Sequence, residues 1–233
     1  MIPMELKVDK KGLLYLDMAI DKSDKVFLNP NKNNCFYRIP STTEYIVKYN
    51  NRNVIYDDCV QIERMLEEFN KRRGKLHNID LPIGYYLEDE LIKGLIVYCY
   101  DNAISLRDFC NIKDLSALTK YYCHEDHLLK NLIRLYLEII SIVEEMLDSK
   151  MYYLDIHSGN FVLFNNQLKL IDFEPNQIAF NKDNNVYYER IVFAVSMLIN
   201  YINHQVGFDY TMDECYQLNV LKEKVKKLEG NLK

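Results

Sequence analysis

Three oxygen-bearing side chains in the second half of the 233-residue chain have types and spacings that suit a metal ion. Asp155 and Asn160 are the ends of the pattern D-x-H-x-G-N, and Asp172 follows in the run I-D-F-E. Mg²⁺ prefers carboxylate and amide oxygens as ligands. An aspartate at the start of a tight loop can also accept the proton of a hydroxyl group or orient that group. The segment therefore favours metal-assisted chemistry on a hydroxyl group.

The segments on either side of this loop predict the elements that hold it. Residues 128–147 have apolar side chains at helical spacing, which predicts a long amphipathic helix. Its expected core face is Leu132, Leu135, Tyr136, Ile139, Ile142, Val143 and Met146. Residues 161–164 and 168–171 are apolar runs around an Asn-Asn-Gln turn, which predicts a hairpin. A lone Asp or Asn is more often a turn residue, but helix, loop, hairpin and second aspartate in this order favour a functional site.

This combination resembles the catalytic and metal-binding loops of the protein-kinase-like superfamily. The D-x-H-x-G-N form is most similar to the branch of aminoglycoside phosphotransferases, fructosamine kinases and lipopolysaccharide-core heptose kinases, and I-D-F-E is similar to a form in choline-kinase-like enzymes. The resemblance covers about residues 25–205 and is strongest over 128–174. It implies an ATP-dependent phosphotransferase in which Asp155 and His157 are catalytic and Asn160 and Asp172 bind Mg²⁺. For His157, a role in loop packing is the alternative.

The first hundred residues are rich in strand patterns. Short apolar or aromatic runs predict five strands, at residues 25–28, 35–39, 45–49, 83–87 and 91–98. Residues 58–71 carry apolar side chains at helical spacing. We therefore expect an α+β, bilobal protein-kinase-like fold. Residues 1–100 would form a five-stranded antiparallel lobe with one helix, and residues 101–233 a reduced, mainly helical lobe that includes helices at 187–202 and 212–228.

The resemblance also implies an ATP site in the first lobe. Lys48, in Tyr-Ile-Val-Lys, would contact the α- and β-phosphates, although a surface lysine is the alternative for this residue alone. Its expected partner is Glu63, with Glu67 one helical turn later as the second choice. Backbone groups of the hinge strand at Tyr98, Cys99 and Tyr100 would bind the adenine edge.

The sequence departs from the family pattern at several places. No glycine-rich loop is present, and asparagines stand in the first hairpin, at residues 29–34; asparagine tolerates left-handed backbone geometry and could form a phosphate lid. Tyr153 replaces the usual histidine two residues before Asp155, a change that concerns loop packing. Glu174 replaces the glycine of the metal loop, which would stiffen that loop. No Ala-Pro-Glu segment follows, so a regulated activation loop is not expected.

Composition excludes several other classes. The formal charge of −5 and the pI near 5.6 argue against a nucleic-acid-binding protein. The six cysteines form no C-x-x-C pair, which argues against a zinc site or a redox dithiol and favours reduced thiols. The N-terminus lacks the apolar block of a signal peptide, and the apolar stretch 191–202 is too short to span a membrane. We therefore expect a soluble, cytoplasmic protein.

The acceptor of the phosphate stays open at this point. The D-x-H-x-G-N form and the missing peptide-docking segment favour a sugar, glycan or other small-molecule hydroxyl. A minimal protein Ser/Thr kinase is the alternative, because little chain lies between the hinge and residue 128 for a small-molecule binding insert. A nucleotide-binding pseudokinase that acts as an interaction module is the third hypothesis, and the absent glycine loop permits it.

Overall fold

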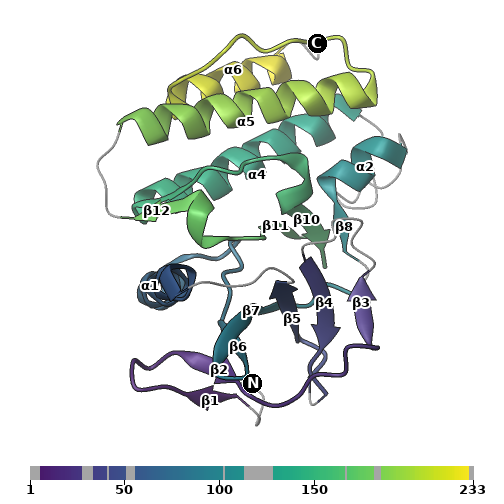
Figure 1. Ribbon diagram of the computed structural model, residues 1–233. Coiled ribbons are helices and arrows are strands. Elements are labelled where there is room, and N and C mark those ends of the chain that lie inside the picture. Colours follow the sequence, from purple (N-terminus) through teal and green to yellow (C-terminus); the bar gives the residue numbers. More distant parts are fainter. Residues whose placement is uncertain are drawn as a thin grey trace. The chain divides into compact units, whose positions relative to one another are not determined.

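The computed structural model describes residues 6–27, 34–40, 42–50, 56–101, 103–112, 128–165, 167–180 and 185–230. The chain divides into two compact units, and its elements are labelled in Figure 1. The first unit comprises residues 1–75, 80–101 and 173–176, and the second comprises residues 76–79, 102–172 and 177–233. Segments 76–79 and 173–176 therefore belong to a different unit from the residues on either side of them.

The first unit is built on one seven-stranded sheet. Its strands are β1 (Lys7–Val8), β2 (Leu14–Leu16), β3 (Lys25–Phe27), β4 (Asn34–Arg38), β5 (Tyr45–Asn50), β6 (Gly84–Glu88) and β7 (Leu91–Tyr98). They lie in the order β1-β2-β6-β7-β5-β4-β3. Every neighbouring pair is antiparallel except β2 and β6, which are parallel. The α+β class is confirmed, but the prediction of five antiparallel strands is wrong in strand number and in one pairing.

The two additional strands come from the N-terminal segment. β1 and β2 have two and three residues, too few for an alternating pattern to show in the sequence. Their turn is held by Asp9, whose carboxylate accepts hydrogen bonds from the backbone N–H groups of Lys11 and Leu13, both at 2.8 Å. Gly12 lies in the left-handed region with φ 77°, which glycine adopts at little cost.

One helix accompanies the sheet. α1 (Tyr56–Arg72) is followed by the short 3₁₀ helix η1 (Arg73–Lys75). Met65, Leu66 and Phe69 are buried, as the helical spacing predicted for residues 58–71. The core of the sheet is a cluster of apolar and tyrosine side chains that includes Leu16, Tyr37, Val47, Tyr86 and Ile96. Most of the asparagine-rich segment proposed as a phosphate lid, residues 29–33, lies outside the described residues.

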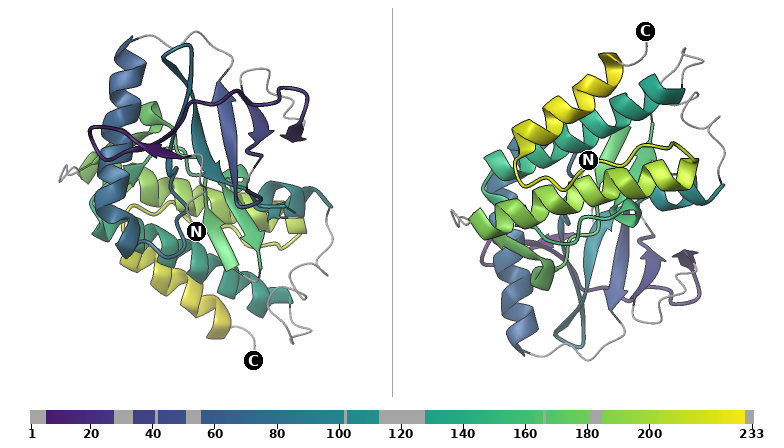
Figure 2. Two further views of the ribbon diagram at one scale, coloured as in Figure 1. Left: turned by 90° about the horizontal axis from the view of Figure 1, so that it is seen from below. Right: turned by 90° about the horizontal axis from the view of Figure 1, so that it is seen from above.

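The second unit is mainly helical. Its helices are α2 (Leu106–Ile112), α4 (Leu128–Asp148), α5 (Asn185–Val206) and α6 (Leu218–Gly230), with the 3₁₀ turn η2 (Ser158–Asn160). Its strands are β8 (Ile104–Ser105), β9 (Met151–Tyr153), β10 (Phe161–Phe164), β11 (Gln167–Leu170) and β12 (Ile178–Phe180). They form two small sheets, β11-β10-β8 and β12-β9. Helices α4, α5 and α6 pack side by side (Figure 2).

The long helix α4 contributes much of the buried core of this unit. All seven residues predicted for its core face are at most 2% exposed, because apolar side chains at this spacing share one side of a helix. The Tyr136 hydroxyl donates a hydrogen bond to Asn203 Oδ1 of α5, and burial raises the pKa of Tyr136. The β10–β11 hairpin is also confirmed, its second strand starting one residue earlier than predicted.

The C-terminal helix is shorter than predicted. The pattern indicated a helix from residue 212, but α6 starts at Leu218. The Asn200 side chain accepts a hydrogen bond from the Met212 N–H at 2.7 Å and donates one to its carbonyl at 2.8 Å. The Met212 carbonyl, which would accept a backbone hydrogen bond in the first turn of a helix starting here, is thus engaged by a side chain.

The segment 76–79 joins the second unit through backbone contacts with β11. The Leu170 N–H donates to the Asn78 carbonyl at 2.9 Å, and Ile79 forms a parallel bridge with Leu170. Lys169 Nζ donates to the His77 carbonyl at 2.7 Å. Residues 76–79, which precede β6, thus cover the β11 edge of the hairpin that follows the D-x-H-x-G-N loop.

Two further findings concern the whole described chain. Cys35, Cys59, Cys99, Cys110 and Cys215 are free thiols, and Cys123 lies outside the described residues. Within the ranges given above, no helix combines the length and the apolar character needed to cross a membrane.

Candidate functional site

The D-x-H-x-G-N segment of the second unit is a tight loop between β9 and β10. At its start, the Leu154 N–H donates to the Gln177 carbonyl at 2.8 Å. At its end, the Asn160 N–H donates to the His157 carbonyl at 3.0 Å, and the Ile171 N–H donates to the Asn160 carbonyl at 2.9 Å. The last of these bonds connects the loop directly to the residue before Asp172.

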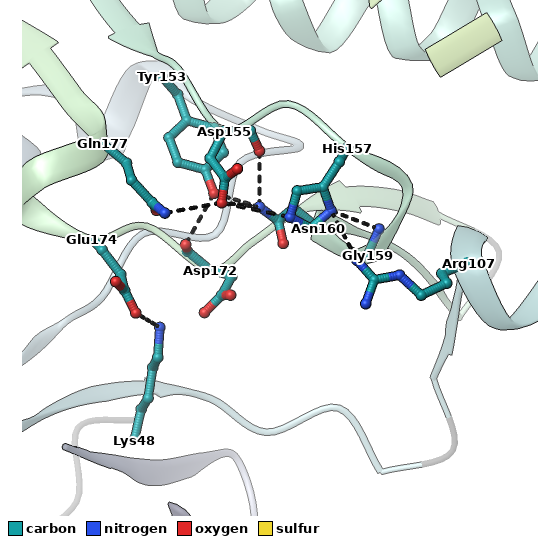
Figure 3. Close-up of polar contacts among 10 residues, drawn as sticks. All are labelled: Lys48, Arg107, Tyr153, Asp155, His157, Gly159, Asn160, Asp172, Glu174 and Gln177. Atoms are coloured by element: carbon teal, nitrogen blue, oxygen red, sulfur yellow. Dashed lines mark hydrogen bonds and ion pairs between the residues drawn. The ribbon is translucent and has the colours of Figure 1, made fainter. Parts of the chain in front are cut away.

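The Asn160 side chain is buried and oriented from one side. Its Nδ2 donates to the Tyr153 hydroxyl at 2.5 Å and to the Asp155 carbonyl at 2.9 Å, and it lies 3.4 Å from Asp155 Oδ2. A carbonyl and a carboxylate oxygen only accept hydrogen bonds, so the amide NH₂ must face Asp155. The residue is 2% exposed, yet its Oδ1 accepts no hydrogen bond from the described residues (Figure 3). This oxygen suits a metal ion.

The two carboxylate oxygens of Asp155 differ in their contacts with the described side chains. Gln177 Nε2 donates to Oδ2 at 3.0 Å, and His157 Nε2 and Asn160 Nδ2 lie 3.5 Å and 3.4 Å from the same atom. Oδ1 has no such partner among the described side chains, and the side chain is 38% exposed. The three nitrogens therefore hold the carboxylate, and Oδ1 can accept a proton from a hydroxyl group.

The orientation of the His157 ring is fixed by its Nδ1 atom. Its Nδ1 accepts a hydrogen bond from the Gly159 N–H at 3.0 Å, and a ring nitrogen that accepts a bond carries no proton. The proton is therefore on Nε2, the atom near Asp155. Arg107 Nη2 lies 3.4 Å from Nδ1. A Cβ at Gly159 would be 2.7 Å from this guanidinium nitrogen, so glycine permits the close approach.

Asp172 has an unusual backbone conformation. Its φ is 72°, in the left-handed region that few non-glycine residues adopt and that Asp and Asn tolerate best. Asp172 is exposed to solvent. The Tyr153 hydroxyl donates to the Asp172 carbonyl at 3.1 Å and accepts from Asn160 Nδ2. One fully buried tyrosine thus connects the two loops that carry the proposed metal ligands.

The second unit therefore brings together four of the residues singled out from the sequence: Asp155, His157, Asn160 and Asp172. Sequence reasoning treated Tyr153 as a packing residue and missed its hydrogen bonds with Asn160 and Asp172, although its position two residues before Asp155 was the available signal. It also missed Arg107 and Gln177, since nothing in their local sequence marks them.

Lys48 lies in the first unit, and its position differs from the expectation in one respect. The side chain is 6% exposed, and its Nζ is 2.7 Å from Glu174 Oε1 (Figure 3). The predicted pair with Glu63 or Glu67 is wrong, because both carboxylates form ion pairs with Lys11 instead. The reason is that these residues of α1 face the β1–β2 turn, an element that the sequence did not reveal.

The predicted hinge residues follow β7 in the first unit. Tyr98 ends the strand opposite Tyr45, and the Cys99 N–H donates to the Glu44 carbonyl at 2.7 Å. Burial raises the pKa of the Cys99 thiol to about 11. The Tyr100 hydroxyl donates to Asp80 Oδ2. Burial is the main reason why the pKa of Tyr100 is raised, and the negative charge of Asp80 raises it further. The Cys99 N–H is therefore engaged within the first unit, and the contact of these residues with adenine stays a prediction.

Mg²⁺ is the metal that the resemblance implies, and the donor set fits it. Mg²⁺ is commonly held by one or two carboxylates, completed by water and substrate phosphates. The exposed carboxylate of Asp172 and the unused Oδ1 of Asn160 are such oxygens. Within the described ranges, no three His, Cys, Asp or Glu side chains come together as a potential metal site, which is the type of cluster that a tightly held structural metal would need.

Comparisons with known proteins add no assignment: no protein-family model matches the chain, and no curated protein matches it significantly.

Proposed function

We propose that this protein is an ATP-dependent phosphotransferase of protein-kinase-like, bilobal architecture, which moves the γ-phosphate of Mg-ATP to a hydroxyl group. The observation that carries the proposal is the network around Tyr153. Its buried hydroxyl accepts a hydrogen bond from Asn160 Nδ2 and donates one to the Asp172 carbonyl, and Asn160 Nδ2 also donates to the Asp155 carbonyl. Phosphoryl transfer needs mainly positioned reactants and neutralised phosphate charge, and these residue types serve both needs.

Each residue has a separate task in this proposal. Asp155 Oδ1 would accept the proton of the acceptor hydroxyl, while Gln177 and His157 keep Oδ2 in place. Asn160 Oδ1 and the Asp172 carboxylate would hold Mg²⁺, which supplies positive charge to the phosphates when bound. The Lys48 ammonium would contact the α- and β-phosphates.

We propose a small-molecule or glycan hydroxyl as the acceptor, on the basis of the D-x-H-x-G-N form. A protein Ser or Thr hydroxyl is the alternative. In both cases Asp155 would act on the acceptor, so one set of variants tests the transfer step, and a panel of glycan and protein acceptors with labelled ATP separates the two acceptor classes.

The test uses two variants that remove one charge and keep the side-chain shape. Asp172→Asn should abolish stabilisation by Mg-ATP in a thermal-shift measurement, whereas Asp155→Asn should keep it. Binding at a hundredfold excess over Kd stabilises a protein by about 2.7 kcal/mol, so the effect is measurable. Asp155→Asn should lower phosphate transfer by roughly 10²-fold or more, since it removes the proton acceptor.

The control is Asp213→Asn, which changes an exposed carboxylate that lies near Lys224 and should leave binding and transfer unchanged. If the wild-type protein shows no shift with millimolar Mg-ATP, the nucleotide proposal is wrong. If it binds Mg-ATP but transfers phosphate neither to an acceptor nor to itself, the pseudokinase hypothesis replaces the proposed function.

A further inference from the structure

The partner of Lys48 is a residue to which the sequence assigned only an effect on loop stiffness. Lys48 lies in the central region of the sheet, on β5 between β4 and β7, and is 5% exposed. Its ammonium is 2.7 Å from Glu174 Oε1, the distance of a charge-assisted hydrogen bond. A buried ammonium is costly without such a partner, so the contact with Glu174 stabilises the charge in this position.

The helix carboxylates have a different partner. Glu63 forms an ion pair with Lys11, and Glu67 Oε1 lies 3.8 Å from the same ammonium. Lys11 belongs to the β1–β2 turn, which Asp9 closes through its carboxylate. Both candidate partners from α1 are therefore attached to a surface lysine.

The segment that carries Glu174 is fixed in the first unit at a second point. Phe173 is 1% exposed and packs edge-on against Phe69 of α1, with ring centroids 5.8 Å apart and planes at 74°. Such aromatic pairs stabilise beyond their buried area. Two successive side chains, one apolar and one charged, thus attach residues 173–176 to the sheet and to α1.

From these contacts we infer that Glu174 is the positioning residue for Lys48 and directs its ammonium to the phosphates of the bound nucleotide, the task that the resemblance gives to a helix glutamate. This inference rests on the proposed function. It also means that the run I-D-F-E carries two functions within three residues: Asp172 as metal ligand and Glu174 as the lysine's partner.

The same contact could have the opposite effect on nucleotide binding, and the two roles predict different results when Glu174 is replaced. If Glu174 competed with phosphate for the ammonium, its removal would strengthen nucleotide binding. If Glu174 positions the ammonium, its removal weakens the binding of ligands that carry phosphates and leaves adenosine unaffected. A merely structural contact would change adenosine and nucleotide binding alike, or neither.

The experiment measures the Kd of Mg-ATP and of adenosine by calorimetry for six proteins: wild type, Glu174→Gln, Lys48→Met, the double variant with both of these changes, Glu63→Gln and Glu144→Gln. Glu144 is the matched control, because it pairs with Lys222 at 2.6 Å and is 35% exposed, against 2.7 Å and 34% for Glu174. We expect Glu174→Gln and Lys48→Met to raise the Kd of Mg-ATP about tenfold or more, the effect of one hydrogen bond to a charged group. Adenosine binding should not change.

Glu63→Gln and Glu144→Gln should bind Mg-ATP like the wild type, and adding Glu174→Gln to Lys48→Met should cause little further loss, because the two residues act as one unit. An unchanged or lowered Kd in Glu174→Gln, or an equal loss in Glu63→Gln, would overturn the inference while leaving the proposed function intact. Absence of Mg-ATP binding in the wild type would overturn both.

Discussion

Replacing Asn160 by aspartate tests the orientation of its amide, on which the proposed metal site depends. The Asn160→Asp side chain keeps its shape but loses the NH₂ group that donates to Tyr153 and to Asp155. In place of a donor, a second carboxylate oxygen would lie about where Nδ2 is now, 3.4 Å from Asp155 Oδ2. The substitution therefore converts an attraction into a repulsion at one defined position.

The magnitude follows from the distance and the exposure. Two unit charges 3.4 Å apart repel by about 5 kcal/mol at an effective dielectric constant of 20 and by about 1 kcal/mol in water. Asp155 is 38% exposed, so the repulsion lies between these limits. Lost hydrogen bonds of a buried residue add about 1 kcal/mol or more. We expect Asn160→Asp to lower the free energy of unfolding by about 3 kcal/mol at pH 7.5 without added metal.

The pH dependence has a defined sign. The neighbouring carboxylate raises the folded-state pKa of one member of the pair above its value in the unfolded chain. The destabilisation is therefore complete above this raised pKa and is relieved as the pH falls through it, because one carboxyl then becomes neutral. The difference from the wild type should shrink between pH 7.5 and pH 5.

Urea unfolding followed by circular dichroism at both pH values measures this difference. Asn165→Asp is the matched control: Asn165 is exposed in the β10–β11 turn with φ 48°, a conformation that aspartate also tolerates. It should change stability by less than about 0.5 kcal/mol. If the two variants lose the same stability, or if the loss in Asn160→Asp does not change with pH, the amide does not face Asp155 and the metal-ligand assignment loses its support.

Two further substitutions test the fold. Gly84→Ala would place a Cβ 2.3 Å from the backbone carbonyl oxygen of Leu14, so β2 or β6 must shift. We expect the free energy of unfolding, measured by thermal unfolding, to fall by about 2 kcal/mol. Gly74→Ala, with no atom within 4 Å of the added Cβ, should leave stability nearly unchanged, and equal effects of the two changes would contradict the parallel pairing of β2 and β6. Tyr136→Phe should cost about 1–3 kcal/mol, because Asn203 Oδ1 loses its buried donor; unchanged stability would exclude that bond.

The parts of the fold that could be predicted are those with a long or repeated local signal. The seven apolar residues of α4 recur over four turns, so their common burial follows from helix geometry alone. The β10–β11 hairpin has two apolar runs around a polar turn. The strands β1 and β2 offer only a few residues each, and the parallel pairing of β2 with β6 joins segments about seventy residues apart, which no local pattern can specify.

The site shows the same division. D-x-H-x-G-N and I-D-F-E could be recognised because residue type and spacing carry their chemistry. The partner of Lys48 could not, because glutamates at 63, 67 and 174 are equivalent in sequence and only the tertiary structure chooses among them. The choice is decided by Lys11, which is placed beside α1 by a turn whose own strands are too short to predict.

Position 172 is subject to two independent requirements, and the sequence reveals only one. As a proposed metal ligand it needs a carboxylate, which Asp or Glu could supply. As a residue with φ 72° it must tolerate the left-handed region, which Asp and Asn do far better than Glu. The Tyr153 hydroxyl bonds to its carbonyl at 3.1 Å, which opposes relaxation of the backbone to an ordinary conformation. Glutamate would therefore fail here for a backbone reason, even if its carboxylate could reach the same ion.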